Sequence, residues 1–80
     1  MAKVVLPDNF LPYTDGVREC EFTVESYRDL VAELRGRWPG LSEVLDKTAV
    51  AIDGQIYQDA LLEPISPESE VFFMARIEGG

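Results

Sequence analysis

Two consecutive glycines, Gly79 and Gly80, end the sequence shortly after a strand-like run of apolar residues. Glycine has no Cβ atom, so a glycine pair can pass through a channel too narrow for any other dipeptide. The last residue also carries a free α-carboxylate, which becomes a reactive acyl group only after activation. The pattern predicts that Gly80 is a reacting group delivered into the active site of another protein.

Other residue types that commonly do chemistry are missing or rare. The chain has no histidine and a single cysteine, Cys20. These counts exclude a zinc site of the usual cysteine–histidine type, a four-thiolate iron–sulfur cluster, histidine-assisted catalysis by serine or cysteine, and an internal disulfide. We expect the chain itself to bind no cofactor and no metal, and to supply no catalytic acid or base.

Cys20 is an alternative candidate for handling sulfur. Residues 19–24 alternate, so that Cys20 shares one side of a strand with the apolar Phe22 and Val24. This pattern favours a cysteine buried as a small hydrophobic residue over a reactive thiol. The acidic neighbours Glu19 and Glu21 would also raise the pKa of the thiol if they lie close to it.

Size and charge limit the possible partners. The 80 residues suit one small domain, and fifteen acidic against seven basic residues give a net charge of −8. Nucleic acid is excluded as a partner because phosphate binding needs clustered lysine and arginine. The acidic surface suits solubility or a basic protein partner. With no span-length apolar run and no signal-peptide pattern, we expect a cytoplasmic protein.

The pattern of apolar residues predicts one main helix and a mixed sheet of four or five strands. Ser26 is a good N-cap, and an apolar stripe of Tyr27, Leu30, Val31, Leu34 and Trp38 follows at helical spacing until Pro39-Gly40 ends the helix. A further helical turn is expected around residues 41–45. The predicted strands cover residues 3–6, 19–24, 48–52, 55–57 and 71–77. Residues 10–16 read as a loop, in which Phe10, Leu11 and Tyr13 either form a docking patch or, as we favour, close the core.

The last strand determines the predicted fold. Residues 71–77 are apolar on both faces, so this strand should be buried on both faces in the middle of the sheet. A last strand that is also central must lie beside an early strand, and we expect it beside the first. One amphipathic helix can cover one face of such a mixed sheet. We therefore predict an α+β fold of the β-grasp type, with residues 1–77 as the domain and residues 78–80 as a flexible Gly-Gly tail.

Four segments resemble the ubiquitin-like sulfur-carrier family of the MoaD/ThiS type, which includes the small subunit of molybdopterin synthase and the sulfur carrier of thiamine synthesis. The helix from Ser26 to Leu34, with Trp38-Pro39-Gly40 after it, is similar to the helix of that family and its end. Residues 50–54 (VAIDG) resemble its "V-A-V-N-G" strand and turn, and residues 69–73 (SEVFF) resemble its "G-D-E-V-x-F-F" segment. Gly79-Gly80 matches its ending, although the family's proline-rich "P-P-V-x-G-G" tail is replaced here by a tail without proline.

The resemblance implies a sulfur carrier rather than an enzyme. An E1-like adenylyltransferase would use ATP to convert the Gly80 carboxylate into an acyl-adenylate, and a persulfide from a sulfurtransferase would displace AMP to give a thiocarboxylate. A downstream biosynthetic enzyme would then accept the sulfur. The last five residues, 76–80, would form an arm that enters the activating enzyme. Gly79 would allow close approach to that enzyme, and Arg76, Ile77 and Glu78 would make the remaining contacts of the arm.

Two other functions remain open from the sequence. A ubiquitin-like protein modifier would use the same activation but end in an isopeptide bond to a target lysine. A plain β-grasp interaction module would use neither reaction, and its terminal glycines would be incidental. The sequence does not name the pathway, the activating enzyme or the final sulfur acceptor.

Overall fold

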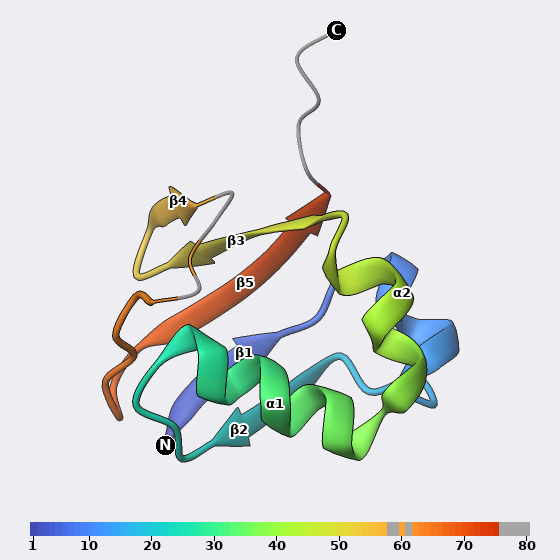
Figure 1. Cartoon of the computed structure of the whole chain (residues 1–80), viewed down its shortest axis with the longest axis horizontal. Coiled ribbons are helices and arrows are strands. Elements are labelled where there is room, and N and C mark those ends of the chain that lie inside the picture. Colours follow the sequence, from blue (N-terminus) through green and yellow to red (C-terminus); the bar gives the residue numbers. More distant parts are fainter. Residues whose placement is uncertain (58–59, 61, 76–80) are drawn as a thin grey trace, which may run out of the picture.

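The computed structural model describes residues 1–57, 60 and 62–75. Within them the chain forms a mixed sheet, one main helix and shorter helical turns (Figure 1). In chain order these are β1 (Ala2–Val5), the 3-10 helix η1 (Asp8–Tyr13), β2 (Glu19–Phe22), α1 (Tyr27–Arg37), the 3-10 helix η2 (Pro39–Leu41), α2 (Ser42–Leu45), β3 (Thr48–Ile52), β4 (Gln55–Tyr57) and β5 (Glu70–Ala75).

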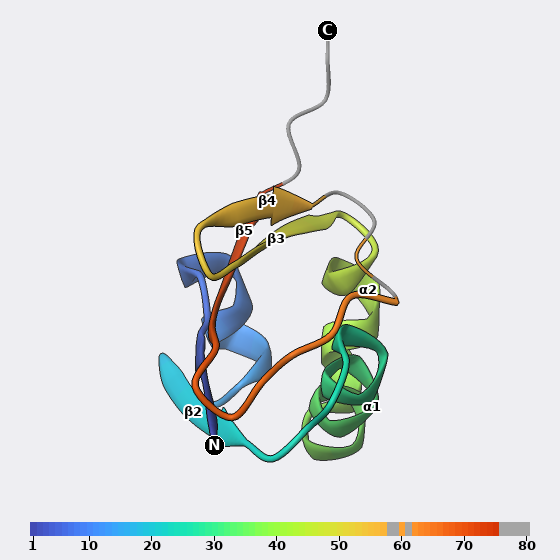
Figure 2. The same cartoon turned by 90° about the vertical axis from the view of Figure 1, so that its left-hand side faces the viewer.

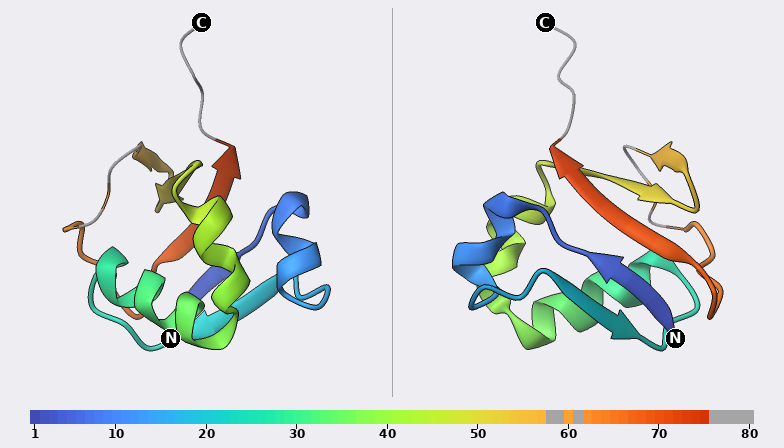
Figure 3. Two further views of the ribbon diagram at one scale, coloured as in Figure 1. Left: turned by 45° about the vertical axis from the view of Figure 1, so that its right-hand side comes forward. Right: turned by 180° about the vertical axis from the view of Figure 1, so that it is seen from behind.

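The strands lie side by side in the order β2-β1-β5-β3-β4 (Figure 3). The two strands farthest apart in sequence, β1 and β5, pair in parallel, with Val4 opposite Val71. The other neighbours are antiparallel. The predicted placement of the last strand in the middle of the sheet and beside the first is therefore confirmed.

The main helix begins and ends where the sequence predicts. Ser26 has an extended backbone, and its Oγ accepts a hydrogen bond at 3.2 Å from the backbone N–H of Asp29. This bond satisfies one of the N–H groups that the first helical turn leaves without a partner. At the other end the N–H of Trp38 bonds to the carbonyl of Leu34, and Pro39 starts the short helix η2.

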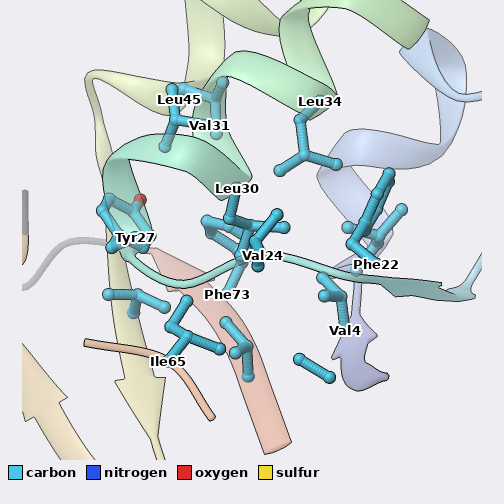
Figure 4. Packing of buried hydrophobic residues seen from close by; sticks show 14 of the residues in the cluster. Val4, Phe22, Val24, Tyr27, Leu30, Val31, Leu34, Leu45, Ile65 and Phe73 are labelled. Atoms are coloured by element: carbon cyan, nitrogen blue, oxygen red, sulfur yellow. The ribbon is translucent and has the colours of Figure 1, made fainter. Parts of the chain in front are cut away.

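The core fills the space between one face of the sheet and α1 (Figure 2). The predicted apolar stripe of α1 is buried, with Leu30 and Leu34 fully inaccessible to solvent. Phe73 of β5 lies in the middle of this layer, with its ring centre 5.5 Å from that of Phe10 and 6.0 Å from that of Tyr27 (Figure 4). The core thus ties the central strand to the helix and to η1.

Residues 8–13 differ from the predicted loop, because they form the 3-10 helix η1. Phe10 points into the core and is 0% exposed, whereas Tyr13 stays 37% exposed. The favoured alternative for this segment, closure of the core, is therefore correct for Phe10. A Cβ atom added at Gly40 would lie 3.1 Å from the Tyr13 ring, so Tyr13 packs closely on the backbone of η2.

A tight turn fixes the start of β5. Asp53 and Gly54 both have positive φ, 50° and 86°, as a two-residue hairpin turn between β3 and β4 requires. The Asp53 carboxylate accepts hydrogen bonds from the Ser69 hydroxyl at 2.8 Å and from the Glu70 backbone N–H at 2.9 Å. The turn predicted from Asp53-Gly54 is confirmed, and its aspartate also holds the first residue of the central strand.

The predicted strand ends shift by one or two residues. β1 begins at Ala2 and stops at Val5, and β2 stops at Phe22 rather than at residue 24. β3 and β4 have the predicted bounds, and the expected helical turn at residues 41–45 is present as η2 and α2. β5 starts one residue early, at Glu70, and is described as far as Ala75, so the predicted strand residues 76–77 lie outside the described residues.

Candidate functional site

The reacting residue predicted from the sequence, Gly80, and the predicted contact residues Arg76, Ile77, Glu78 and Gly79 all lie outside the described residues. The structure instead describes the strand that leads to them. β5 is the central strand of the sheet and is paired with β3 up to Ala75, which stands opposite Thr48. The described part of the candidate site therefore consists of the end of β5 and the surface beside it.

The first residue of β3 fixes the position at which β5 ends. Thr48 is buried, and its hydroxyl donates a hydrogen bond to the backbone carbonyl of Val44 in α2. The N–H of Lys47 bonds to the same carbonyl. Because Thr48 is anchored to α2 in this way, its ladder partner Ala75 is held in a well-defined position at the end of the sheet (Figure 1).

The second face of β5 is not buried as the sequence predicts. Val71 and Phe73 point into the core, but Phe72 is 41% exposed and Met74 is only partly buried. The prediction of burial on both faces is wrong because α1 covers one face of the sheet only, and no described element covers the other (Figure 2). An apolar strand in the middle of the sheet is consequently open to a partner on that face.

Neighbouring strands extend this open face into an apolar row. Phe72 stands opposite Val5 of β1 on one side and Ala51 of β3 on the other, and Ala51 stands opposite Ile56 of β4. Ile56 is 61% exposed, whereas Ala51, between Phe72 and Ile56, is 8% exposed and Val5 is partly buried, so Phe72 and Ile56 are the exposed members of the row. We call Val5, Phe72, Ala51 and Ile56 the open-face row. Exposed aromatic and aliphatic side chains gathered in one place are typical of protein-binding surfaces.

Charged residues lie next to this row, on β1 and β2. Lys3 and Glu19 form an ion pair at 3.5 Å between their charged atoms, and both side chains are about half exposed. Such an exposed pair contributes little to stability. Its place beside the open-face row suits a role in orienting a charged partner.

Cys20 packs against the core as a half-buried residue. Burial raises the pKa of its thiol, and the charge of Arg37 opposes that shift. The pKa of the thiol is thus raised, as the sequence predicts, but the main cause is burial and not the neighbouring glutamates. A thiol with a raised pKa is a poor nucleophile at neutral pH, so the structure supports the structural interpretation of Cys20.

Among the residues that the structure describes, no group of three histidine, cysteine, aspartate or glutamate side chains could hold a metal ion. In the same part of the chain no helix is long and apolar enough to cross a membrane.

No model of a known protein family matches the sequence, and no curated protein matches it significantly. Solved structures do match. A chain of the Amycolatopsis orientalis BexX/CysO complex superposes with a TM-score of 0.85 at 13% identity, over all of both chains. Mycobacterium tuberculosis CysO gives 0.83 at 15% identity, over 96% of this chain and 100% of that one. The chain has the β-grasp fold.

A third solved structure matches at a somewhat higher identity than these two. The small archaeal modifier protein 1 of Methanosarcina acetivorans superposes with a TM-score of 0.81 at 19% identity, over 99% of this chain and 95% of that one. High TM-scores at identities this low show the fold alone, and they confirm the predicted β-grasp fold class. They leave the function to be argued from the chain itself.

The open-face row is the part of the site that the sequence did not indicate. The sequence could have indicated it, because it predicts a single amphipathic helix, and one such helix can bury only one face of a sheet. Phe72 and Met74 therefore had to be exposed unless a second layer covered them. Ile56 alone, in a strand of three residues, gives no such signal.

Proposed function

We propose that this protein is a ubiquitin-like sulfur carrier whose Gly80 carboxylate is adenylated and then converted into a thiocarboxylate. The observation that carries the proposal is the course of β5. This central strand of a β-grasp domain leads, within five residues of its last described residue Ala75, to the carboxylate that follows Gly79. The chain shares its fold with two CysO structures, one of which is a complex with BexX.

The proposed chemistry uses the protein as a reactant. The Gly80 carboxylate attacks the α-phosphate of ATP on an E1-like adenylyltransferase, which releases pyrophosphate and gives the acyl-adenylate. The outer sulfur of a persulfide on a sulfurtransferase attacks the acyl carbon and displaces AMP. A thiol then cleaves the resulting acyl disulfide, which leaves the thiocarboxylate on Gly80 and a disulfide on the thiol partner.

The proposed role of each candidate residue follows from this chemistry. Gly79 leaves room around the reacting carbonyl, since it has no side chain. Arg76, Ile77 and Glu78 contact the channel of the activating enzyme. Phe72 of the open-face row lies on the strand that leads to this arm, and we assign to the row the docking of the activating enzyme.

The final acceptor is a biosynthetic enzyme that binds the same arm. One similar structure is that of a BexX/CysO complex, in which a protein of this fold is bound to another protein. Molybdopterin synthase is one acceptor that the sequence resemblance suggests. The absence of proline from residues 74–80 distinguishes this arm from the typical tail of its small subunit.

Intact-mass measurement tests the proposal. After incubation with ATP, a cognate E1-like enzyme, a persulfide donor and a thiol reductant, the protein should gain the mass difference between one sulfur and one oxygen, located at Gly80. Deletion of Gly80 should abolish the gain, and Cys20→Ser should retain it. Sulfur located on Cys20 would contradict the proposal. No modification by a verified cognate enzyme would leave the interaction module as the function.

The docking role of the open-face row has its own test. Phe72→Thr removes the exposed aromatic ring but keeps a residue that favours strands, so the fold should persist. The variant should be loaded with sulfur several-fold more slowly at limiting activating enzyme. Thr23→Val changes one exposed residue away from this row and should be loaded at the wild-type rate. Equal loading of Phe72→Thr and wild type would exclude the row as the docking surface.

A protein modifier is the second candidate function, supported by the structural similarity to the small archaeal modifier protein 1. It shares the activation step and differs in the acceptor, which would be the ε-amino group of a lysine on another protein. The same incubation distinguishes the two functions when target proteins are added. Isopeptide-linked products without a pool of free thiocarboxylate would favour the modifier.

A further inference from the structure

The strand β2 has an outer edge that faces away from the rest of the sheet. It is the terminal strand of the order β2-β1-β5-β3-β4. Because the N–H of Leu6 bonds to the carbonyl of Arg18, the residues of β2 that bond to β1 are Cys20 and Phe22. The backbone groups of Glu19 and Glu21 therefore point outward, and no backbone partner for them is found among the described residues.

A hollow of about 480 Å³ lies beside this edge, between β2 and the last turns of α1. Its lining comes from both elements and consists of Phe22, Ala32, Glu33, Gly36 and Arg37. We call it the β2–α1 groove. A Cβ atom added at Gly36 would meet no other atom within 4 Å, so the groove is open at that point.

Arg37 forms a wall of the β2–α1 groove. Its guanidinium carbon lies 5.8 Å from the centre of the Phe22 ring and 5.1 Å from that of Trp38, as a cation over two aromatic rings. The i,i+4 spacing from Glu33 would allow an ion pair, but the structure shows none between them, nor any other for Arg37 among the described residues. Glu33 and Arg37 thus both line the groove, and neither has an ion-pair partner in the described part of the chain, so their charges balance across it.

From the edge and the groove together we infer a second binding surface, in which an extended peptide of a partner protein adds to β2 as a further strand. The outward N–H and C=O groups of Glu19 and Glu21 would bond to the peptide backbone. Alternate side chains of the peptide would enter the β2–α1 groove, where aliphatic residues fit against Phe22, Ala32 and Gly36.

The intervening side chains of the peptide would lie on the opposite face of the sheet, beside the carboxylates of Glu19 and Glu21. Both are exposed, and Lys3 pairs with the first of them. Lysine or arginine suits these positions, as does the net charge of −8. A second copy of this chain is disfavoured, because two antiparallel β2 strands would place these glutamates against each other. The peptide that fits this surface is thus one in which aliphatic and basic residues alternate.

This surface does not depend on the proposed sulfur chemistry. β1 separates β2 from β5, and Figure 1 shows β2 at the other side of the sheet from the end of β5. A partner on β2 would contact Glu19, which stands opposite Val5, but would leave Phe72, Ile56 and the end of β5 accessible. The protein could then be held by one partner while its C-terminus is processed by another.

Nuclear magnetic resonance with a capped hexapeptide of alternating valine and lysine tests the inference. The peptide should shift the backbone amide signals of residues 19–22 and of Ala32 and Gly36, and should slow hydrogen exchange at Glu19 and Glu21. A peptide with glutamate in place of lysine should bind at least tenfold more weakly. Shifts centred on Phe72 and Ile56, equal binding of the two peptides, or no binding would overturn the inference.

Two variants test the groove and the charges separately. Gly36→Leu should fill the groove and weaken peptide binding at least tenfold, without a loss of stability, because the added side chain enters open space on a helix. Glu21→Lys should weaken binding several-fold, whereas the same charge change at the exposed Glu43 of α2 should have a much smaller effect. Unchanged binding by Gly36→Leu, or equal effects of the two lysine variants, would overturn the inference.

Discussion

Tyr27 gives the protein a pH dependence that its sequence does not reveal. The side chain is 9% exposed in the core, and burial raises the pKa of its phenol to about 12, with the charge of Arg35 opposing the shift. In the unfolded chain the phenol titrates near its ordinary pKa of about 10. The native state therefore holds this proton at a pH where the unfolded state has lost it.

The free energy of unfolding should consequently fall as the pH rises from about 10 to about 12. Below pH 10 the contribution of Tyr27 is fully present, and it is lost as the pH passes through the native pKa. Between pH 8 and pH 11, wild type should lose about 1.4 kcal/mol more than Tyr27→Phe, which cannot ionise. Urea denaturation at the two pH values measures the difference. Tyr13→Phe, at an exposed tyrosine, should behave as wild type, and identical pH profiles for wild type and Tyr27→Phe would contradict the prediction.

At the scale of elements, α1 is held mainly by its buried stripe. Leu34 is 0% exposed and lies one turn before the end of the helix. Leu34→Ala should lower the free energy of unfolding by about 2–5 kcal/mol, because it removes buried methyl groups and leaves a cavity. Glu33→Ala, on the exposed face of the same turn, should change it by no more than about 0.5 kcal/mol. Denaturation of both variants in urea, followed by circular dichroism, compares the two, and equal effects would mean that the stripe does not form the core.

Elements that are determined by residues close together in the sequence were predictable from it. The cap at Ser26 and the turn at Asp53-Gly54 depend on backbone chemistry within a few residues, and both are as predicted. The 3-10 helix η1 was missed because Pro12 and the neighbouring turn residues favour a loop locally. It forms in this fold with Phe10 anchored in the core against Phe73, a contact between residues far apart in the sequence.

The candidate binding surfaces were less predictable than the fold. The exposure of Phe72 depends on whether a second layer covers the sheet, and the β2–α1 groove depends on how a helix lies against an edge strand. Both are properties of the tertiary arrangement. The reacting carboxylate at Gly80 is the opposite case, since it was inferred from the sequence alone and stays a prediction.

At the scale of the whole molecule, the arrangement places the last strand in the centre of the fold. β5 pairs with both β1 and β3 and supplies Val71 and Phe73 to the core. A chain shortened to residues 1–69 lacks this strand, so both ladders and a large part of the core are lost. We expect it to show no cooperative unfolding transition, because neither half of the remaining sheet can bury its apolar face alone.

A chain shortened to residues 1–77 should behave differently, because the proposed arm contributes chemistry and not stability. It keeps β5 and every core residue described, so its free energy of unfolding should lie within about 0.5 kcal/mol of that of the full chain. It should gain no sulfur in the intact-mass assay, since it lacks Gly79 and Gly80. Urea denaturation followed by Trp38 fluorescence, together with the mass measurement, separates the two properties. A large loss of stability would show that residues 78–80 belong to the folded domain, and sulfur loading of the shortened chain would show that the reacting group lies elsewhere.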